Sequence, residues 1–318
     1  MPSNYLHTLN EFPELLRILE KEMGIVAGLI EKDYWIMHVL YGLRKQGFSF
    51  EMKGGTSLSK GYHIIDRFSE DIDIQINPPA ALGVNTNPKS SKDKAVASRK
   101  SYYDWLAQEI KIEGIISIER DTAFDNTTTY NSGGLRLYYK SHTEVVEGLK
   151  SGILLEVGFD TVTPNNKCTI SSWAYDQTLG TSGIKITDNR AIDIACYHPG
   201  YTLVEKLQTI ATKFRQEKEK NTELPNLMRQ YYDVYSLLAN TQVKEFIGTE
   251  EYFAHKEVRF KGPEKGINIA ASEAFLLSQP ALRERFKKRY EATASLYYKG
   301  QPPFDDLLNR IHAHINTL

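Results

Sequence analysis

Two aspartates, Asp71 and Asp73, interrupt an apolar run in the stretch RFSEDIDIQI. If residues 71–76 form a strand, both carboxylates lie on one face, whereas Ile72 and Ile74 lie on the other. Two like charges held this close repel each other, and uncompensated burial would raise their pKa values or destabilise the fold. A divalent cation resolves this conflict, because hard oxygen ligands suit Mg²⁺ bound together with substrate phosphates. The alternative is a half-exposed edge strand with solvated aspartates.

A glycine pair, Gly54 and Gly55, precedes these aspartates in the stretch KGGTSLSKGY. Glycines let a ligand approach the backbone closely, and a helix N-terminus favours anions. Thr56 and Ser57 begin a predicted helix over residues 56–65, and their hydroxyl groups could donate to phosphate oxygens. The spacing is not that of a Walker A loop. A phosphate-binding turn is one interpretation of residues 54–57, and an ordinary strand-to-helix turn is the other.

A third carboxylate would complete a metal site of this kind. The apolar stretch ILLEVGFD contains Glu156 in its middle and Asp160 at its end. Glu156 is the better candidate, because a charge between Leu155 and Val157 is harder to explain structurally. The alternative is a solvent-facing glutamate on a half-exposed strand.

The elements that must position these side chains follow from hydrophobic periodicity. Apolar residues at three- and four-residue spacings predict helices in the first fifty residues, and alternating character predicts a strand at residues 71–76. Residues 77–98 are rich in Pro, Asn, Ser and Lys and predict an exposed loop, followed by a helix over residues 99–114. Further strands are predicted at residues 48–52, 115–121, 135–140 and 153–160.

The chain becomes predominantly helical after residue 190. Residues 202–220 place Leu203, Leu207 and Ile210 along one stripe, and residues 226–240 predict another helix. We therefore expect an α+β protein with a core domain over residues 1–190, including N-terminal helices, and a helical domain over residues 191–318.

Composition narrows the class of protein. The chain has 318 residues and a net charge of −1, so no global field marks it as a nucleic-acid binder. No apolar stretch is long enough to span a membrane, and the N-terminus lacks the pattern of a secretory signal. The only cysteines are Cys168 and Cys196, which favours a reducing cytoplasm and inert buried thiols.

At this point the sequence resembles the AbiEii/AbiGii (MenT-like) toxin family of the nucleotidyltransferase superfamily. The resemblance rests on KGGTSLSKGY followed by RFSEDIDIQI, and also on IEKDYWI, LVEKLQTI and RQYYDVYSLL, which together span most of the first 240 residues. It implies a polymerase-β-like nucleotidyltransferase core with helical additions. It also implies transfer of a nucleoside monophosphate from an NTP, with Mg²⁺, to an acceptor such as tRNA, in a protein commonly paired with an antitoxin.

The resemblance also assigns roles to individual residues. The residues Gly54, Gly55, Thr56 and Ser57 would hold the triphosphate, Asp71 and Asp73 would bind the metals, and Glu156 would fit the third acidic strand. Lys206 would contact donor phosphates, and Asp233 would be a further catalytic residue. The alternatives are that Lys206 extends outward from its apolar stripe and that Asp233 forms a surface pair with Arg229 on its own helix.

Two basic clusters could follow the phosphate backbone of an RNA, and Arg136 is a further candidate for a phosphate contact. The clusters are Lys89, Lys92, Lys94, Arg99 and Lys100 in the first, and Arg283, Arg285, Lys287, Lys288 and Arg289 in the second. The alternative for each cluster is a solvated face. The resemblance, together with these clusters, favours an RNA 3′ end as the acceptor. The alternatives are a nucleotidyltransferase that acts on a small molecule such as an antibiotic and an inert regulatory protein with the same fold.

Overall fold

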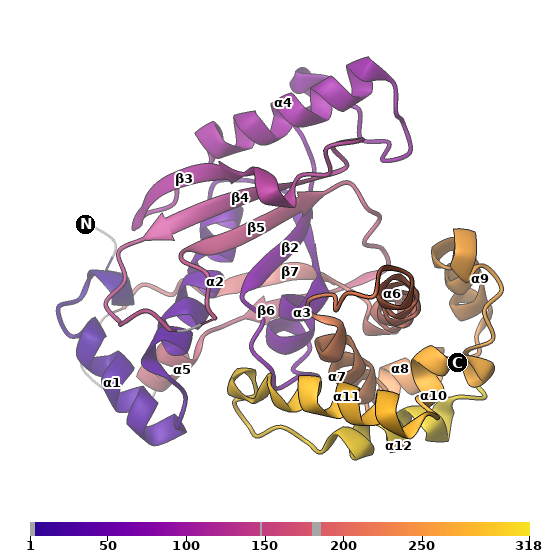
Figure 1. Ribbon diagram of the computed structural model, residues 1–318. Helices are drawn as coiled ribbons and strands as arrows, with labels where there is room; N and C mark the ends of the chain where they lie inside the picture. Colours follow the sequence, from indigo (N-terminus) through magenta and orange to yellow (C-terminus); the bar gives the residue numbers. More distant parts are fainter. Residues whose placement is uncertain (1–3, 147, 180–185) are drawn as a thin grey trace. The chain divides into compact units, whose positions relative to one another are not determined.

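The chain forms two compact units in the computed structural model (Figure 1), which describes residues 4–146, 148–179 and 186–318. The first unit comprises Met1–Gly61 and Ser69–Tyr197, and the second comprises Tyr62–Phe68 and His198–Leu318. The chain thus enters the second unit briefly at residues 62–68 and returns before the aspartate pair. The predicted division at residue 190 lies just before strand β7, Ala191–Tyr197, which falls in the first unit here.

The first unit is built on a seven-stranded mixed sheet with the order β3-β4-β5-β2-β1-β7-β6. Strand β2 pairs in antiparallel fashion with β1 and in parallel fashion with β5, so it lies inside the sheet. The alternative of an aspartate-bearing edge strand is therefore wrong. The strands are β1 Phe50–Lys53, β2 Asp71–Ile76, β3 Ile115–Asp121, β4 Ser132–Tyr139, β5 Ile153–Gly158, β6 Asn165–Ile170 and β7 Ala191–Tyr197.

The two faces of β2 differ as the alternating sequence predicts. Ile72, Ile74 and Ile76 are fully buried, whereas Asp71 and Asp73 on the other face are partly accessible. On the apolar face, helix α4 places Tyr103 against Gly133, and α2 stacks Trp35 on Tyr139. The helices of this unit are α1 Phe12–Met23, α2 Ala27–Lys45, α3 Gly54–Thr56, α4 Asp93–Glu109 and α5 Trp173–Thr178.

Three local predictions differ from the structure. The helix after the glycine pair begins at Gly54, becomes π-helical at Ser57 and ends at Gly61, well before residue 65. Helix α4 begins at Asp93, inside the predicted loop. Strands β6 and β7 were not predicted, because neither sequence alternates strongly. They are stabilised by pairing with each other and by the pairing of β7 with β1. The α+β class itself is confirmed.

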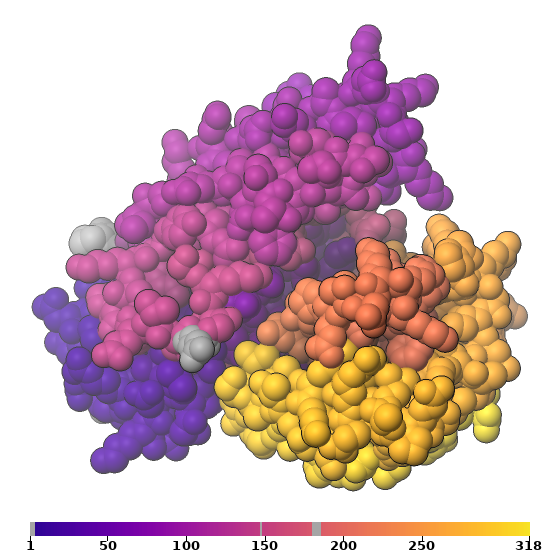
Figure 2. Space-filling model, in the orientation of Figure 1, coloured from indigo at the N-terminus to yellow at the C-terminus, as the bar shows by residue number. Residues whose placement is uncertain are grey.

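The second unit is helical in its described residues. The apolar stripe of α6 is buried as predicted, with Leu203, Leu207 and Ile210 fully excluded from solvent. Figure 2 shows the part of this unit that contains α11 and α12, in yellow. The helices are α6 Pro199–Lys220, α7 Leu227–Leu237, α8 Thr241–Phe246, α9 Glu250–Arg259, α10 Glu273–Leu276, α11 Pro280–Glu291 and α12 Phe304–His314. No helix among the described residues is long and apolar enough to cross a membrane.

Candidate active site

Strand register brings three carboxylates together on one face of the sheet. Asp73 of β2 lies directly opposite Lys53 of β1 on one side and opposite Glu156 of β5 on the other. Asp71 lies two residues earlier on the same face of β2. We call Asp71, Asp73 and Glu156 the carboxylate cluster. Asp160 lies beyond the end of β5 and instead forms an ion pair with Lys53, with 3.2 Å between Nζ and Oδ2.

The carboxylate cluster is electrostatically strained. Burial, reinforced by the charges of Asp73 and Asp71, raises the pKa of Glu156 to about 8. Burial also raises the pKa of Asp71, while Lys150 acts in the opposite direction. The Oδ1 atom of Asp71 is buried and makes no hydrogen bond to any residue that the structure describes. A cation at this position would therefore relieve both the repulsion and the missing contact.

A small cavity opens beside the carboxylate cluster. Its volume is about 230 Å³, and Asp73 and Glu156 line it together with Lys53 and Asp160. Gly158 and Ser132 are paired across β5 and β4 and also line the cavity, and neither has a large side chain that would fill it. The cavity therefore gives a ligand access to the carboxylates from within the first unit.

The turn of residues 54–61, which we call the glycine turn, packs directly on the cluster. Gly54 has φ +77°, and a Cβ atom built on it would lie 2.1 Å from Oδ2 of Asp73. Only glycine fits here, because a side chain would be strained and would collide with the carboxylate. Thr56 is fully buried and donates its hydroxyl hydrogen to the backbone oxygen of Asp71. This hydroxyl group ties the glycine turn to β2, so its hydrogen is already engaged, and a phosphate contact by Thr56 stays a prediction.

Lysines surround the start of β2. Lys150 Nζ lies 4.0 Å from Oδ2 of Asp71 and is half exposed. Lys32 of α2 is buried and donates to Oε2 of Glu70 at 2.9 Å, immediately before Asp71 in the chain. These cations partly compensate the negative charge of the carboxylate cluster without contacting all of its oxygens.

The two remaining predicted residues lie in the second unit and contact each other. Asp233 of α7 is fully buried; it accepts two hydrogen bonds from Arg67, at 2.6 and 2.7 Å, and lies 2.9 Å from Nζ of Lys206. Burial alone would raise the pKa of Asp233, but the charges of Arg67 and Lys206 outweigh it and lower that pKa. The alternative of a surface pair on α7 is therefore wrong. Nor does Lys206 simply extend into solvent, since its ammonium group meets a buried carboxylate.

The residues of the first unit are compatible with a magnesium ion. Among the described residues, no group of three or more His, Cys, Asp or Glu side chains forms a ready-made metal cage. Mg²⁺ does not need one, because it commonly keeps several waters and binds one or two carboxylates together with substrate phosphates. The unpartnered Asp71 oxygen and the neighbouring Asp73 match that donor set.

Several of the predicted basic residues are engaged within the protein. Arg99 is fully buried and donates to backbone oxygens, including that of Thr129 at 2.8 Å. On α11, Arg283 pairs with Asp305, and Arg289 pairs with Glu217. Elsewhere, Arg136 donates to Asp121 and to the backbone oxygen of Ser151. These contacts weaken the case for the second cluster as a continuous RNA-binding surface, whereas Lys89, Lys92, Lys94 and Lys100 of the first cluster are exposed. The contacts of Arg136 likewise weaken its case as a phosphate contact.

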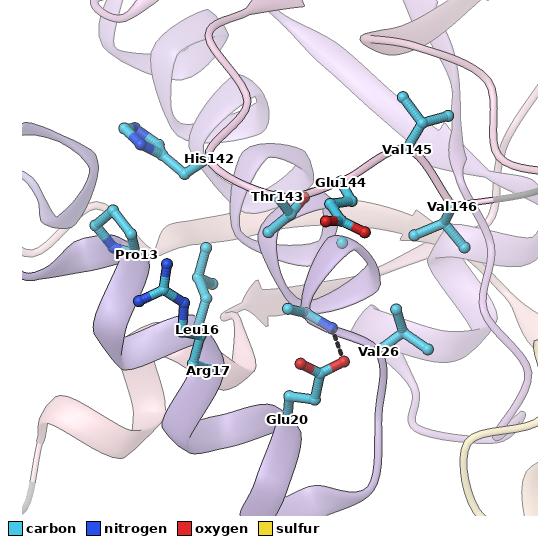
Figure 3. Close-up of a pocket in the computed structure, with 12 residues that line it drawn as sticks. Pro13, Leu16, Arg17, Glu20, Val26, His142, Thr143, Glu144, Val145 and Val146 are labelled. Atoms are coloured by element: carbon cyan, nitrogen blue, oxygen red, sulfur yellow. Dashed lines mark hydrogen bonds between the residues drawn. The ribbon is translucent and has the colours of Figure 1, made fainter.

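A larger hollow in the first unit does not carry this chemistry. It has a volume of about 480 Å³ and lies between α1 and residues 142–146 (Figure 3). Its lining combines apolar side chains, such as Leu16 and Val26, with charged ones, of which Glu20 accepts a hydrogen bond from the backbone of Ala27. The carboxylates that line it, Glu20 and Glu144, are not paired through strand register as Asp73 and Glu156 are, so the smaller cavity beside Glu156 is the better candidate.

Several site residues were missed from the sequence. Lys32 and Asp33 lie in an apolar helical stretch, and a charge in such a stretch is the same signal that singled out the aspartates of β2. Lys53 and Lys150 had no such signal, because nothing local indicates which strand ends become neighbours. Arg67 is 166 positions from Asp233, and its role depends on tertiary contact.

Comparison with known proteins gives one matching protein family and several similar solved structures. The family described as "Nucleotidyl transferase AbiEii toxin, Type IV TA system" matches residues 38–310. The crystal structure of JHP933 from Helicobacter pylori is similar, with 12% identity, a TM-score of 0.47 and coverage of 92% of this chain and 93% of that one. An antigenic nucleotidyltransferase-like protein from Paracoccidioides brasiliensis is 13% identical, with a TM-score of 0.33 and coverage of 86% and 97%. The comparison with curated proteins gave no match.

Proposed function

The chain belongs to the AbiEii nucleotidyl transferase toxin family of type IV toxin–antitoxin systems, and from this premise we propose that it transfers a nucleoside monophosphate from an NTP to an RNA 3′ end, in a Mg²⁺-dependent reaction. The observation that carries the proposal is the carboxylate cluster, in which Glu156 lies opposite Asp73 and Asp71 has a buried oxygen without a protein partner. Transfer RNA is the favoured acceptor on the family resemblance.

The first unit supplies the metal ligands and a site for the triphosphate. Asp71, Asp73 and Glu156 would hold Mg²⁺, which when bound would stabilise charge on the phosphates and on the attacking oxygen. The backbone of Gly54 and Gly55 would bind the triphosphate, since the glycine turn leaves no side chain between the backbone and the cluster. The acceptor hydroxyl group loses its proton to solvent as its oxygen forms a bond to the α-phosphorus, the bond between the α-phosphorus and the oxygen that bridges to the β-phosphate breaks, and pyrophosphate leaves with that oxygen.

In the second unit, we assign Lys206 to the donor phosphates and Asp233 to positioning Lys206. Asp233 is too deeply buried to touch a substrate, and it binds Lys206 and Arg67 simultaneously. An ammonium group held in this way loses little side-chain freedom when it binds an anion. A cognate antitoxin is the protein partner that the type IV family assignment suggests.

The test is incubation of the purified protein with each labelled NTP, Mg²⁺ and total RNA. We expect label from at least one NTP to enter RNA, to depend on Mg²⁺, and to fall about 100-fold or more in Asp73→Asn, because the metal-binding charge is removed. Label that enters only a small molecule, or no label transfer at all, would contradict the proposal.

A matched pair of variants tests which residue is the third carboxylate. Glu156→Gln removes the ionisable carboxyl group opposite Asp73, whereas Asp160→Asn removes a carboxyl group that lines the same cavity but is paired with Lys53. We expect Glu156→Gln to lose transfer and Asp160→Asn to retain most of it. The reverse result would assign the role to Asp160.

A further inference from the structure

Helix α2 contains three consecutive buried charges, Glu31, Lys32 and Asp33, which we call the EKD segment. Their exposed fractions are 1%, 3% and 1%. Burying a charge is costly unless it is paired and hydrogen-bonded. Each of the three is hydrogen-bonded or ion-paired in a different part of the first unit, because successive residues on a helix point in directions about 100° apart.

Lys32 contacts the segments from which β2 and β5 begin. Its Nζ atom donates to Oε2 of Glu70 at 2.9 Å and to the backbone oxygen of Lys150 at 2.5 Å. The same Glu70 oxygen accepts the backbone N–H of Lys150 at 3.2 Å. Glu70 immediately precedes Asp71, and β2 and β5 pair from Asp71 opposite Leu154 onward. The Lys32 ammonium group therefore joins the two strands that carry the carboxylate cluster, just before their pairing begins.

Asp33 contacts the glycine turn rather than the strands of the carboxylate cluster. Its Oδ1 atom lies 2.7 Å from Nζ of Lys60, near the end of the glycine turn, and its Oδ2 atom accepts the backbone N–H of Trp173 at 2.9 Å. Lys60 is itself largely buried, so the pair is shielded from solvent. This ion pair holds the π-helical end of the glycine turn against α2.

Glu31 provides an internal comparison. It is equally buried but accepts hydrogen bonds from Ser141, from the backbone of His142 and from Thr143, at 2.8 to 2.9 Å. His142 and Thr143 line the hollow of Figure 3 rather than the cavity beside Glu156. Glu31 therefore holds the loop of residues 141–143 against α2, whereas Lys32 and Asp33 hold segments of the candidate site.

We propose that Lys32 and Asp33 are positioning residues of the nucleotidyltransferase site: Lys32, through Glu70, fixes the strands of the carboxylate cluster, and Asp33, through Lys60, fixes the glycine turn. One helix would thus set the separation between the metal ligands and the triphosphate site. The proposal rests on the proposed function for the meaning of the site, but the contacts themselves can be tested without it.

Hydrogen exchange by mass spectrometry tests the contacts in the full chain. Lys32→Met keeps the apolar stem and removes the charge, and we expect faster exchange at residues 70–76 and 150–156. Asp33→Asn should accelerate exchange at residues 54–61, and the control Glu31→Gln should do so at residues 140–146. If Lys32→Met and Glu31→Gln accelerate the same segments, or neither accelerates any, the positioning role is wrong whether or not the protein transfers nucleotide.

Kinetics then separate positioning from general stability. Misplaced catalytic groups cost on the order of 100-fold in rate, so Lys32→Met should lower kcat to that extent and leave the KM for NTP nearly unchanged. Asp33→Asn should instead raise the KM for NTP, and Glu31→Gln should alter neither constant at a temperature where all variants are folded. An equal loss of kcat in all three variants would reduce the EKD segment to a structural element.

Two double variants keep the proposal falsifiable if a single charge removal prevents folding. Lys32→Met with Glu70→Gln, and Asp33→Asn with Lys60→Met, remove both charges of a pair and so avoid leaving one buried and unpaired. We expect each double variant to fold and to show the kinetic defect expected for its pair, which is a lower kcat for Lys32 with Glu70 and a higher KM for NTP for Asp33 with Lys60. A folded double variant with parental kcat and KM would overturn the assignment for that pair.

Discussion

Because Gly54 has no side chain, the backbone of the glycine turn can approach the Asp73 carboxylate closely. Its φ of +77° is unfavourable for residues with a side chain, and its Cα atom faces Asp73 at a distance that excludes a Cβ atom. Position 54 therefore requires glycine for two reasons, which are its backbone conformation and its close contact with Asp73. Both requirements can be separated experimentally because the chain offers a glycine that has only the first.

We predict that Gly54→Ala abolishes transfer, whereas Gly47→Ala does not. Gly47 has φ +89° and nothing within 4 Å of a built Cβ atom. The left-handed conformation should cost each variant about 1–2 kcal/mol of folding stability, but only Gly54→Ala displaces the Asp73 carboxylate. Thermal unfolding and labelled-NTP transfer on the same preparations measure the two effects. Equal activity in both variants would show that Asp73 accommodates the added methyl group.

Helix α2 also contributes a buried histidine to the first unit. His38 is 1% exposed, and its Nε2 atom lies 2.9 Å from the backbone oxygen of Glu113, an acceptor that requires a hydrogen on Nε2. Burial lowers the pKa of His38 to about 4, and burial followed by the charge of His38 lowers the pKa of His7 to about 3. The two ring centroids lie 4.7 Å apart. Because both pKa values are lowered, both imidazoles are neutral in the folded chain near neutral pH.

Because the pKa values of His38 and His7 are lowered in the folded chain, we predict that the protein loses stability on acidification. Below pH 6.5 the unfolded chain binds protons at these histidines and the folded chain does not, so stability falls as the pH drops from about 6.5 toward 4, by at most about 1.4 kcal/mol per pH unit for His38. His38→Gln, whose amide can still donate to Glu113, should flatten this dependence. Melting temperatures between pH 7 and 5 measure it. His63→Asn, at an exposed position, is the control, and equal slopes in all three proteins would contradict the assignment.

At the scale of the whole chain, residues 62–68 leave the first unit and supply Arg67 to the second. The guanidinium group binds Asp233 with two hydrogen bonds, while Lys206 provides a second positive charge. The second unit therefore depends on a segment far away in sequence to neutralise its buried carboxylate. The two cations differ in burial, which suggests different functions for them.

We predict that replacing Arg67 mainly lowers folding stability, whereas replacing Lys206 mainly lowers activity. Arg67→Met leaves a buried carboxylate without its two-point partner and should destabilise the chain by about 3–5 kcal/mol. Lys206→Met leaves the Arg67 pair intact, so the protein should remain folded, but it should lose transfer on the order of 100-fold. Melting temperature and label transfer distinguish the two variants. A Lys206→Met protein that transfers nucleotide near the parental rate would remove Lys206 from the reaction.

The local sequence alone determined which residues share a face and which are chemically unusual. Alternation placed Asp71 and Asp73 on one face of β2, and helical spacing placed Leu203, Leu207 and Ile210 in one stripe, because side-chain direction follows from the backbone of the same few residues. The α+β class and the nucleotidyltransferase family followed from the same patterns and motifs.

Only the tertiary structure decided which of these residues meet. The parallel register of β2 and β5 placed Glu156, and not Asp160, opposite Asp73, and chain crossing brought Arg67 to Asp233. It also showed that Thr56 bonds to the backbone of Asp71, that Lys32 bonds to Glu70 and that Asp33 pairs with Lys60. A local pattern specifies where a side chain points, but its partner depends on strand register and helix packing between segments that are distant in sequence.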